Sequence, residues 1–125
     1  MRWIVDGMNV IGSRPDGWWR DRRRAMATLV ERLEQWAATE HADVTVVFEQ
    51  PPSPPIESSV VAVRHAPRPA PNSADDEIVR LVCADAHPEQ VCVATSDRTL
   101  AARVQQAGAC VFPAERLRSL IDPQT

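Results

Sequence analysis

The chain has no lysine and no tyrosine, and all 14 of its basic residues are arginines. The absence of lysine argues against a phosphotransfer or phosphatase domain, because such a domain needs a nucleophilic aspartate and usually a lysine beside it. The net charge of −3 and the pI near 5.6 also argue against a general nucleic-acid binder, which usually carries a basic face. These values leave room for a small basic rim around an acidic centre.

Long apolar runs are absent as well. No stretch reaches the roughly 20 residues that a membrane-spanning helix needs, and the amino terminus has no apolar segment of the secretory type. We therefore expect a protein that does not insert into membranes and that works in the cytoplasm. The length of 125 residues and the hydrophobic content of 44% are typical of one globular domain, expected to span residues 1–125.

Cysteine is scarce and odd in number. Cys83, Cys92 and Cys110 have no C-x-x-C spacing, which argues against a zinc or redox motif. All three lie in expected core elements, so we interpret them as buried, unpaired thiols. The three histidines are scattered without ligand spacing, and no role is assigned to them.

Short apolar runs alternate with helical patterns along the chain. The apolar runs at 3–5 and 91–94 are too short for helices and too continuous for strands with one solvent-exposed face. Such runs are typical of parallel strands that are buried on both faces. The five expected strands are 3–5, 43–49, 59–64, 91–94 and 109–112. The expected helices are 18–38 (capped by Asp16), 74–86, 98–106 (stopped by Gly108) and a last short one through Leu120, with a loop at 7–17.

This alternation predicts a three-layer α/β/α fold with a mainly parallel five-stranded sheet and right-handed crossovers. We expect the strand order 3-2-1-4-5, which places the first and fourth strands side by side. Ligands bind beyond the carboxyl ends of parallel strands, particularly where the strand order reverses. Asp6 and Asp97 follow these two strands and should meet at that edge.

Three acidic segments therefore point to one metal centre, formed by Asp6, Asp75 and Asp97. Two carboxylates about 4 Å apart repel each other by about 4 kcal/mol at an effective dielectric of about 20. A hard divalent cation is the simplest compensation for that repulsion. Oxygen ligands of this kind suit Mg²⁺ or Mn²⁺, whereas zinc prefers histidine or cysteine.

Each of these residues also has a purely structural interpretation. Asp6 precedes a glycine and could form a turn, the acidic triplet 75–77 could stabilise a helix N-terminus, and Asp97 could cap the helix that follows it. Asn9 could orient the first carboxylate or a scissile phosphate, or it could cap local backbone. Ser96 is expected to donate a hydrogen bond at the site.

Arginine and tryptophan supply candidate contacts to RNA. Arg98, beside the expected site, could bind a phosphate bidentately or could be a solvated helix residue. Positive charge at a helix N-terminus is unfavourable for the helix dipole, so the arginines that open the first long helix favour a functional interpretation, such as tracking an RNA backbone. These are Arg20, Arg22, Arg23 and Arg24. The pair Trp18 and Trp19 could stack on unpaired bases or cover the core.

Four segments carry a recognisable pattern in order along the chain: VDGMNVIG at 5–12, VVFE at 46–49, SADD at 73–76 and VATSD at 93–97. Together they resemble the DGYN(V/I)IG, VVFD, TAD(D/E) and VATSD motifs of the YacP-like NYN domains, a branch of the PIN-like nucleases. The match spans nearly the whole chain. It departs from the family at Met8, which replaces an aromatic residue, at Glu49, which replaces aspartate, and in the proline-rich segments, which replace a more polar, basic stretch.

The resemblance implies a metal-dependent endoribonuclease whose carboxylates bind one or two Mg²⁺ or Mn²⁺ ions. By position, Asp6, Asp75 and Asp97 match the acidic centre of the family, with Asn9 and Ser96 as polar companions. Two further acidic positions, whose role as ligands is open, are Asp76 and Glu49.

RNA is the expected partner, while a homodimer and ribosomal or RNA-processing partners are possibilities that the sequence does not decide. The alternative function is a non-catalytic RNA-binding or scaffolding module on the same fold. A degraded module would be expected to have lost one of the three aspartates, and all three are present. A toxin-type nuclease is open within the first interpretation.

Overall fold

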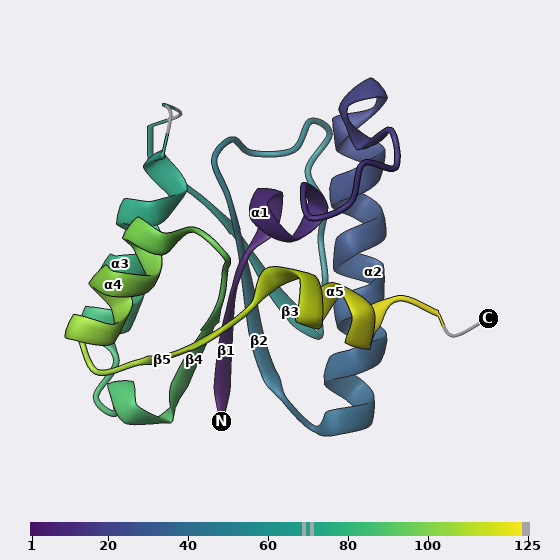
Figure 1. Ribbon diagram of the computed structural model, residues 1–125. Helices are drawn as coiled ribbons and strands as arrows, with labels where there is room; N and C mark the ends of the chain where they lie inside the picture. Colours follow the sequence, from purple (N-terminus) through teal and green to yellow (C-terminus); the bar gives the residue numbers. More distant parts are fainter. Residues whose placement is uncertain (69, 71, 124–125) are drawn as a thin grey trace.

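The protein is described by a computed structural model that covers residues 1–68, 70 and 72–123. Five parallel strands form one sheet in the order β3-β2-β1-β4-β5 (Figure 1). The strands are β1 (Arg2–Asp6), β2 (Asp43–Phe48), β3 (Val61–His65), β4 (Val91–Ala94) and β5 (Cys110–Phe112). The predicted fold class and strand order are confirmed.

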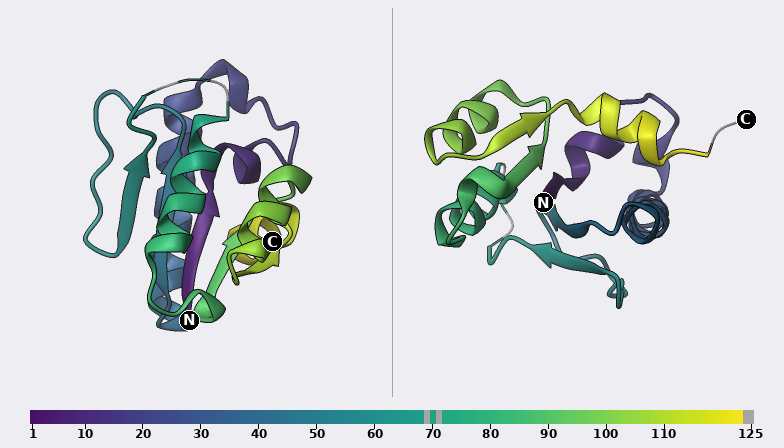
Figure 2. Two further views of the ribbon diagram at one scale, coloured as in Figure 1. Left: turned by 90° about the vertical axis from the view of Figure 1, so that its left-hand side faces the viewer. Right: turned by 90° about the horizontal axis from the view of Figure 1, so that it is seen from below.

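Helices cover both faces of the sheet. They are α1 (Gly7–Ile11), α2 (Arg22–Glu40), α3 (Ser73–Ala84), α4 (Arg98–Gln106) and α5 (Ala114–Ile121), with short 3₁₀ turns at Trp18–Arg20 and Pro88–Gln90. Figures 1 and 2 show α3 and α4 on one side of the sheet and α2 and α5 on the other. Within the described part of the chain, no helix is both long enough and apolar enough to cross a membrane.

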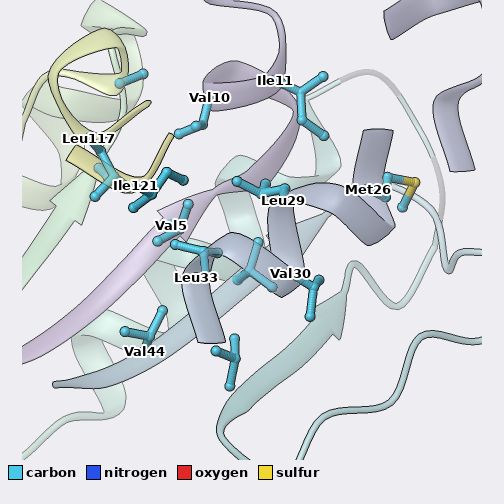
Figure 3. Packing of buried hydrophobic residues seen from close by; sticks show 14 of the residues in the cluster. Val5, Val10, Ile11, Met26, Leu29, Val30, Leu33, Val44, Leu117 and Ile121 are labelled. Carbon is cyan, nitrogen blue, oxygen red and sulfur yellow. The ribbon is translucent and has the colours of Figure 1, made fainter. Parts of the chain in front are cut away.

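The sheet separates two hydrophobic cores, because successive side chains of a strand point to opposite faces. Val5 packs in the core beneath α2 and α5, whereas its neighbour Ile4 packs in the core beneath α3 and α4, and both are fully buried. Figure 3 shows the first of these cores, in which Leu29 and Leu33 of α2 and Leu117 of α5 gather over β1. Burial on both faces explains the continuous apolar character of the central strands.

The entry to α2 differs from the prediction. The expected cap, Asp16, binds Arg118 instead (Oδ2 to Nη2, 2.6 Å), and the actual cap is Asp21, whose Oδ1 accepts a hydrogen bond from the backbone N–H of Arg24 at 3.1 Å. The reason is Gly17, which has a φ of 87°. This left-handed conformation is incompatible with the first turn of a helix that would begin beside Asp16.

Several other expected boundaries were wrong by a few residues. The helix expected at 74–86 ends at Ala84, and the Asp85 carboxylate accepts a hydrogen bond from the backbone N–H of His87. The strand expected from residue 59 begins at Val61, because the Ser58 hydroxyl accepts hydrogen bonds from the N–H groups of residues 60 and 61 and forms a turn there. The fifth strand begins at Cys110.

The cysteines also differ from the expectation. Cys92 is buried, but Cys83 and Cys110 are exposed, and all three are free thiols. Cys83 lies near the end of α3, and Cys110 lies on the edge strand β5, where one neighbouring strand is missing. Cys83 is therefore exposed because it is not on the buried face of α3, whereas Cys92 and Cys110 differ because β4 is an inner strand and β5 is an edge strand.

Residues 7–11, which were expected in a loop, form the single-turn helix α1 directly after β1. The turn from strand to helix requires glycine at position 7. A Cβ atom there would lie 2.5 Å from Cε1 of Phe48 and 3.1 Å from the carbonyl oxygen of Val47, and the Phe48 side chain is fully buried. This close approach holds Asp6 at the junction of β1 and α1.

Gly7→Ala is expected to destabilise the protein by about 1–3 kcal/mol, because the added methyl group overpacks the core against Phe48. Urea unfolding of Gly7→Ala, Phe48→Leu and the double variant tests this cause. The double variant should lose less stability than the sum of the single losses, with a coupling of at least about 0.5 kcal/mol. Additive losses would mean that Phe48 is not the obstacle.

Candidate metal centre

Asp6 is the most buried carboxylate of the predicted site, at 6% exposure, and it lies at the carboxyl end of β1. Its Oδ2 accepts a hydrogen bond of 2.9 Å from the Thr95 hydroxyl, which follows β4. Although Asp6 occupies the N-cap position of α1, its side chain makes no capping hydrogen bond. The buried carboxylate is therefore not explained by a turn or cap.

Asp97 is linked to Asp6 through the same threonine. The Thr95 hydroxyl oxygen accepts a hydrogen bond of 3.1 Å from the Asp97 backbone N–H. Asp97 Oδ1 accepts one of 2.9 Å from the N–H of Leu100, so the capping interpretation of Asp97 is confirmed. No residue of the described chain donates a hydrogen bond to its Oδ2. The cap thus occupies one oxygen of this carboxylate and leaves the other without a hydrogen-bond donor from the described chain.

Four carboxylates interact electrostatically in this region, and we call them the acidic centre: Asp6, Glu49, Asp75 and Asp97. Burial raises the pKa of Asp6 from its ordinary value of 3.8 to about 7, the Thr95 hydrogen bond opposes this rise, and repulsion by the other three carboxylates adds to it. Burial and then repulsion by Asp97 also raise the pKa of Asp75. These side chains come from four separate segments, at or shortly after the ends of β1, β2 and β4 and in the first turn of α3, and all belong to the carboxyl end of the sheet.

The donor set of the acidic centre fits a hard cation. It offers carboxylate oxygens and no imidazole or thiolate, which suits Mg²⁺ or Mn²⁺. Among the residues that the structure describes, no three Asp, Glu, His or Cys side chains are close enough to ligate one ion together. Mg²⁺ usually keeps several waters and binds through one or two carboxylates. The arrangement therefore suits an ion held partly through water rather than an all-protein cage.

Asn9 and Ser96 hold the surrounding elements together. The Asn9 side-chain oxygen accepts a hydrogen bond of 2.8 Å from the Ser96 backbone N–H, which ties α1 to the segment after β4. The Ser96 hydroxyl accepts a hydrogen bond from the N–H of Ala114 at 2.9 Å and lies 3.5 Å from Oε2 of Glu115, at the start of α5. The donor to the acidic centre is therefore Thr95, and the Ser96 hydroxyl positions α5 instead.

Two residues of this region were missed from the sequence. Thr95 directly follows the buried strand β4, and that position was a usable signal. Arg103 of α4 pairs with Asp76 (Nη1 to Oδ1, 3.0 Å), and its positive charge partly opposes the rise in the pKa of Asp75. No sequence signal identified it, because the two helices meet only in the folded protein. Arg98, the predicted phosphate contact, is exposed at the first position of α4 and makes no ion pair with any described residue.

The arginines at the start of α2 are divided between two surfaces. Arg23 lines a cavity that also contains Glu49 of the acidic centre, and its Nε donates a hydrogen bond of 3.3 Å to the carbonyl oxygen of Pro54. Arg24 lines a different cavity, between α2 and α5. Arg20 is exposed in the 3₁₀ turn that precedes α2. Of these three predicted RNA contacts, Arg23 is the one beside the acidic centre.

The tryptophan pair is divided in a similar way. Trp18 is half-buried and packs against the core beneath α2, whereas Trp19 is 50% exposed. Their rings meet edge to face with centroids 5.8 Å apart. Trp18 therefore covers the core, and the Trp19 ring lies on the surface.

Asp6→Asn is expected to stabilise the metal-free protein at neutral pH. Between the ordinary pKa of 3.8 and the folded-state value of about 7, the folded protein holds a proton that the unfolded chain releases, so the free energy of unfolding falls as pH rises. The full difference is on the order of 4 kcal/mol, at about 1.4 kcal/mol per pH unit. Asparagine keeps an oxygen acceptor for Thr95 but carries no charge.

Urea unfolding in the presence of a chelator, from pH 4 to pH 8, measures this effect. The stability curves of wild type and Asp6→Asn should converge near pH 4 and separate toward pH 8, with the variant the more stable. Asp43→Asn is the matched control, since Asp43 is exposed at the start of β2, at the amino-terminal end of the strands and thus opposite the acidic centre. Parallel curves for wild type and Asp6→Asn across the whole range would rule out the raised pKa.

Comparison with known proteins places this geometry in a family. Two solved structures of Rae1 (YacP) from Bacillus subtilis are similar: one has a TM-score of 0.81 at 25% identity and covers 97% of this chain and 73% of the other. A point mutant of that protein has a TM-score of 0.79 at 24% identity, covering 97% and 74%. No curated protein matches the chain. The YacP-like NYN domain matches residues 3–125, which confirms the resemblance of the four motifs, and the chain therefore belongs to this family of PIN-like nucleases.

Proposed function

We propose that this protein is a metal-dependent endoribonuclease that hydrolyses phosphodiester bonds of RNA. The observation that supports this most is the burial of Asp6 near other carboxylates at the carboxyl ends of the strands, where burial first and then mutual repulsion raise the pKa values of Asp6 and Asp75. Perturbed carboxylates of this kind are typical of functional sites. Membership of the PIN-like nucleases, which generally use divalent metals, supports the same conclusion.

In this proposal Asp6, Asp75 and Asp97 would hold Mg²⁺ or Mn²⁺ partly through bound water, with Glu49 and Asp76 at the margin of the site. The bound cation supplies an activated water and neutralises charge on the scissile phosphate and on the leaving oxygen. Asp6 must lose its proton before it can bind a cation. Cation affinity is therefore expected to rise as the pH passes through about 7, the folded-state pKa of Asp6.

The remaining residues position the carboxylates. Thr95 bonds both the Asp6 carboxylate and the Asp97 backbone, so it fixes the spacing of these two residues. The hydrogen bond from Ser96 to Asn9 holds α1 against the segment that carries Asp97. A geometry fixed before the substrate arrives needs little reorganisation during the reaction.

Purified protein is expected to cleave labelled RNA in the presence of Mn²⁺ or Mg²⁺ and to stop when a chelator is added. Asp97→Asn should lower the cleavage rate by about 100-fold or more, because even residues that only support metal ligands cost 10–100-fold when they are replaced. Asparagine caps helices as well as aspartate does, so this variant keeps α4 intact.

Asp43→Asn serves again as the control and should cleave RNA at the wild-type rate. RNA binding without any metal-dependent cleavage would favour the non-catalytic module instead. Equal rates for wild type and Asp97→Asn would place the activity at another site or in a contaminant.

A further inference from the structure

A cavity of about 260 Å³ lies directly beside the acidic centre, and Glu49 belongs to both. Its wall combines α1, α2 and the segment that follows β2. The lining residues beyond Glu49 are Met8, Arg22, Arg23, Met26, Phe48 and residues 50–53. The volume is slightly below the roughly 300–1,000 Å³ of pockets for drug-sized ligands, so it suits a smaller group.

The walls of this cavity are apolar and adaptable. Phe48 and Met26 are buried and form part of the core, while Met8 is half-buried. Pro51 and Pro52 add rigid apolar surface. Thioethers make favourable contacts with aromatic rings and adapt to irregular shapes. A flat, aromatic group is the ligand chemistry that such walls favour.

The rim of the cavity is basic. Arg22 and Arg23 line it, and neither makes an ion pair with any carboxylate of the described chain. The Arg22 guanidinium carbon lies 5.3 Å from the centroid of the Trp18 ring, and Arg23 is tethered through Nε to Pro54. Arginine binds phosphate oxygens in a bidentate manner. The rim therefore offers two guanidinium groups, and Glu49, which belongs to the acidic centre, lines the same cavity.

A second cavity, of about 310 Å³ between α2 and α5, is lined by none of the four carboxylates of the acidic centre. Two of its three arginines are already paired, Arg32 with Asp122 at 2.7 Å and Arg118 with Asp16 at 2.6 Å, and the third, Arg24, is exposed. Its polar groups serve to hold α2, α5 and the loop after α1 together. The cavity beside Glu49 is thus the better candidate for a ligand that brings both an aromatic ring and phosphate.

We propose that the cavity beside Glu49 is a subsite for one unpaired base of the RNA substrate, with the adjoining phosphates on Arg22 and Arg23. This inference rests on the proposed function, because it names the substrate class of the same site. A base stacked in a duplex cannot enter the cavity, whereas bases of single strands and loops can turn outward onto a protein surface. The nuclease should therefore select single-stranded or looped RNA.

Fluorescence anisotropy of a short labelled single-stranded RNA, measured with the full chain in chelator, tests the subsite. The RNA is used intact and with one abasic ribose at each position in turn. Loss of the bound base should weaken wild-type binding about fivefold or more at one position, as expected for a single base stacked on protein. A fully duplexed RNA should bind more weakly than the single strand.

Two variants separate the base from the phosphates. Met8→Ala should weaken binding of the intact RNA about fivefold and should abolish most of the abasic effect, because the base has lost its contact. Arg23→Gln should weaken the binding of intact and abasic RNA alike, by about tenfold, because it removes a charged contact to phosphate. Arg116→Gln is the matched control: Arg116 on α5 is also without an ion pair among the described residues, and its variant should bind like wild type.

The melting temperature of each variant is measured first, because Met8 is half-buried and its replacement could destabilise the fold. Arg23 lies outside the hydrophobic core, so Arg23→Gln tests the same subsite without that risk. The inference is overturned if removal of a base weakens binding at no position, or if it weakens binding to Met8→Ala as much as to wild type. Binding of duplex RNA as tight as that of the single strand also overturns it.

Cleavage of the same RNAs with Mn²⁺ is measured separately. Metal-dependent cleavage by wild type that is independent of Met8 and Arg23 refutes the subsite and leaves the nuclease standing. Base-dependent binding without cleavage supports the subsite and refutes the nuclease.

Discussion

Asp6 is held in a buried position among three other carboxylates, and the surrounding structure is arranged around the unfavourable charge of this residue. Desolvation alone disfavours the ionised form of a buried carboxylate, and repulsion by its neighbours increases the effect. One neutral hydrogen bond, from Thr95, acts in the other direction but leaves the pKa near 7. A cation would relieve both contributions at once. Ionisation of Asp6 is therefore costly without a positively charged partner, which is the physical basis of the proposed metal centre.

The sheet topology brings this charge cluster together. Strands β1 and β4 are parallel neighbours, paired from Arg2 with Val91 to Val5 with Ala94, so their carboxyl ends meet at one edge. The crossover helix α3 begins near the same edge and adds Asp75. The glycine at position 7 allows β1 to pass into α1 against Phe48. The same packing that builds the two cores thus determines which carboxylates become neighbours.

Much of this arrangement could be predicted from the sequence. Continuous apolar strands separated by helical segments determine the fold class and the strand order, because burial on both faces and right-handed crossovers leave few alternatives. The acidic segments could be placed for the same reason. The family resemblance, carried by four short motifs, agreed with that placement and is confirmed by the match over residues 3–125.

The details that were missed depend on contacts between distant segments. Thr95 and Ser96 are adjacent hydroxyl residues, and only the folded structure shows that the first bonds Asp6 and the second bonds the start of α5. Arg103 reaches Asp76 across two helices. Local sequence predicts Asp16 as a cap, whereas in the structure it forms an ion pair with Arg118, about 100 residues away in sequence. Local sequence rules identify residues that can cap or bind, but they do not identify the partner.

The most direct test of the metal centre is thermal unfolding of wild type, Asp97→Asn and Asp97→Ala, each with millimolar Mn²⁺ and with chelator. A cation that binds only the folded state stabilises it by about 2.7 kcal/mol at 100 times its Kd, so the wild type should melt at a higher temperature with Mn²⁺. Asp97→Asn keeps the cap and removes one charge, so it should melt above wild type in chelator and gain less from Mn²⁺. Asp97→Ala should also lose the cap, at a cost of about 1 kcal/mol in both conditions. If Mn²⁺ raises the melting temperatures of wild type and Asp97→Asn equally, Asp97 is a helix cap alone and the proposed metal centre is wrong.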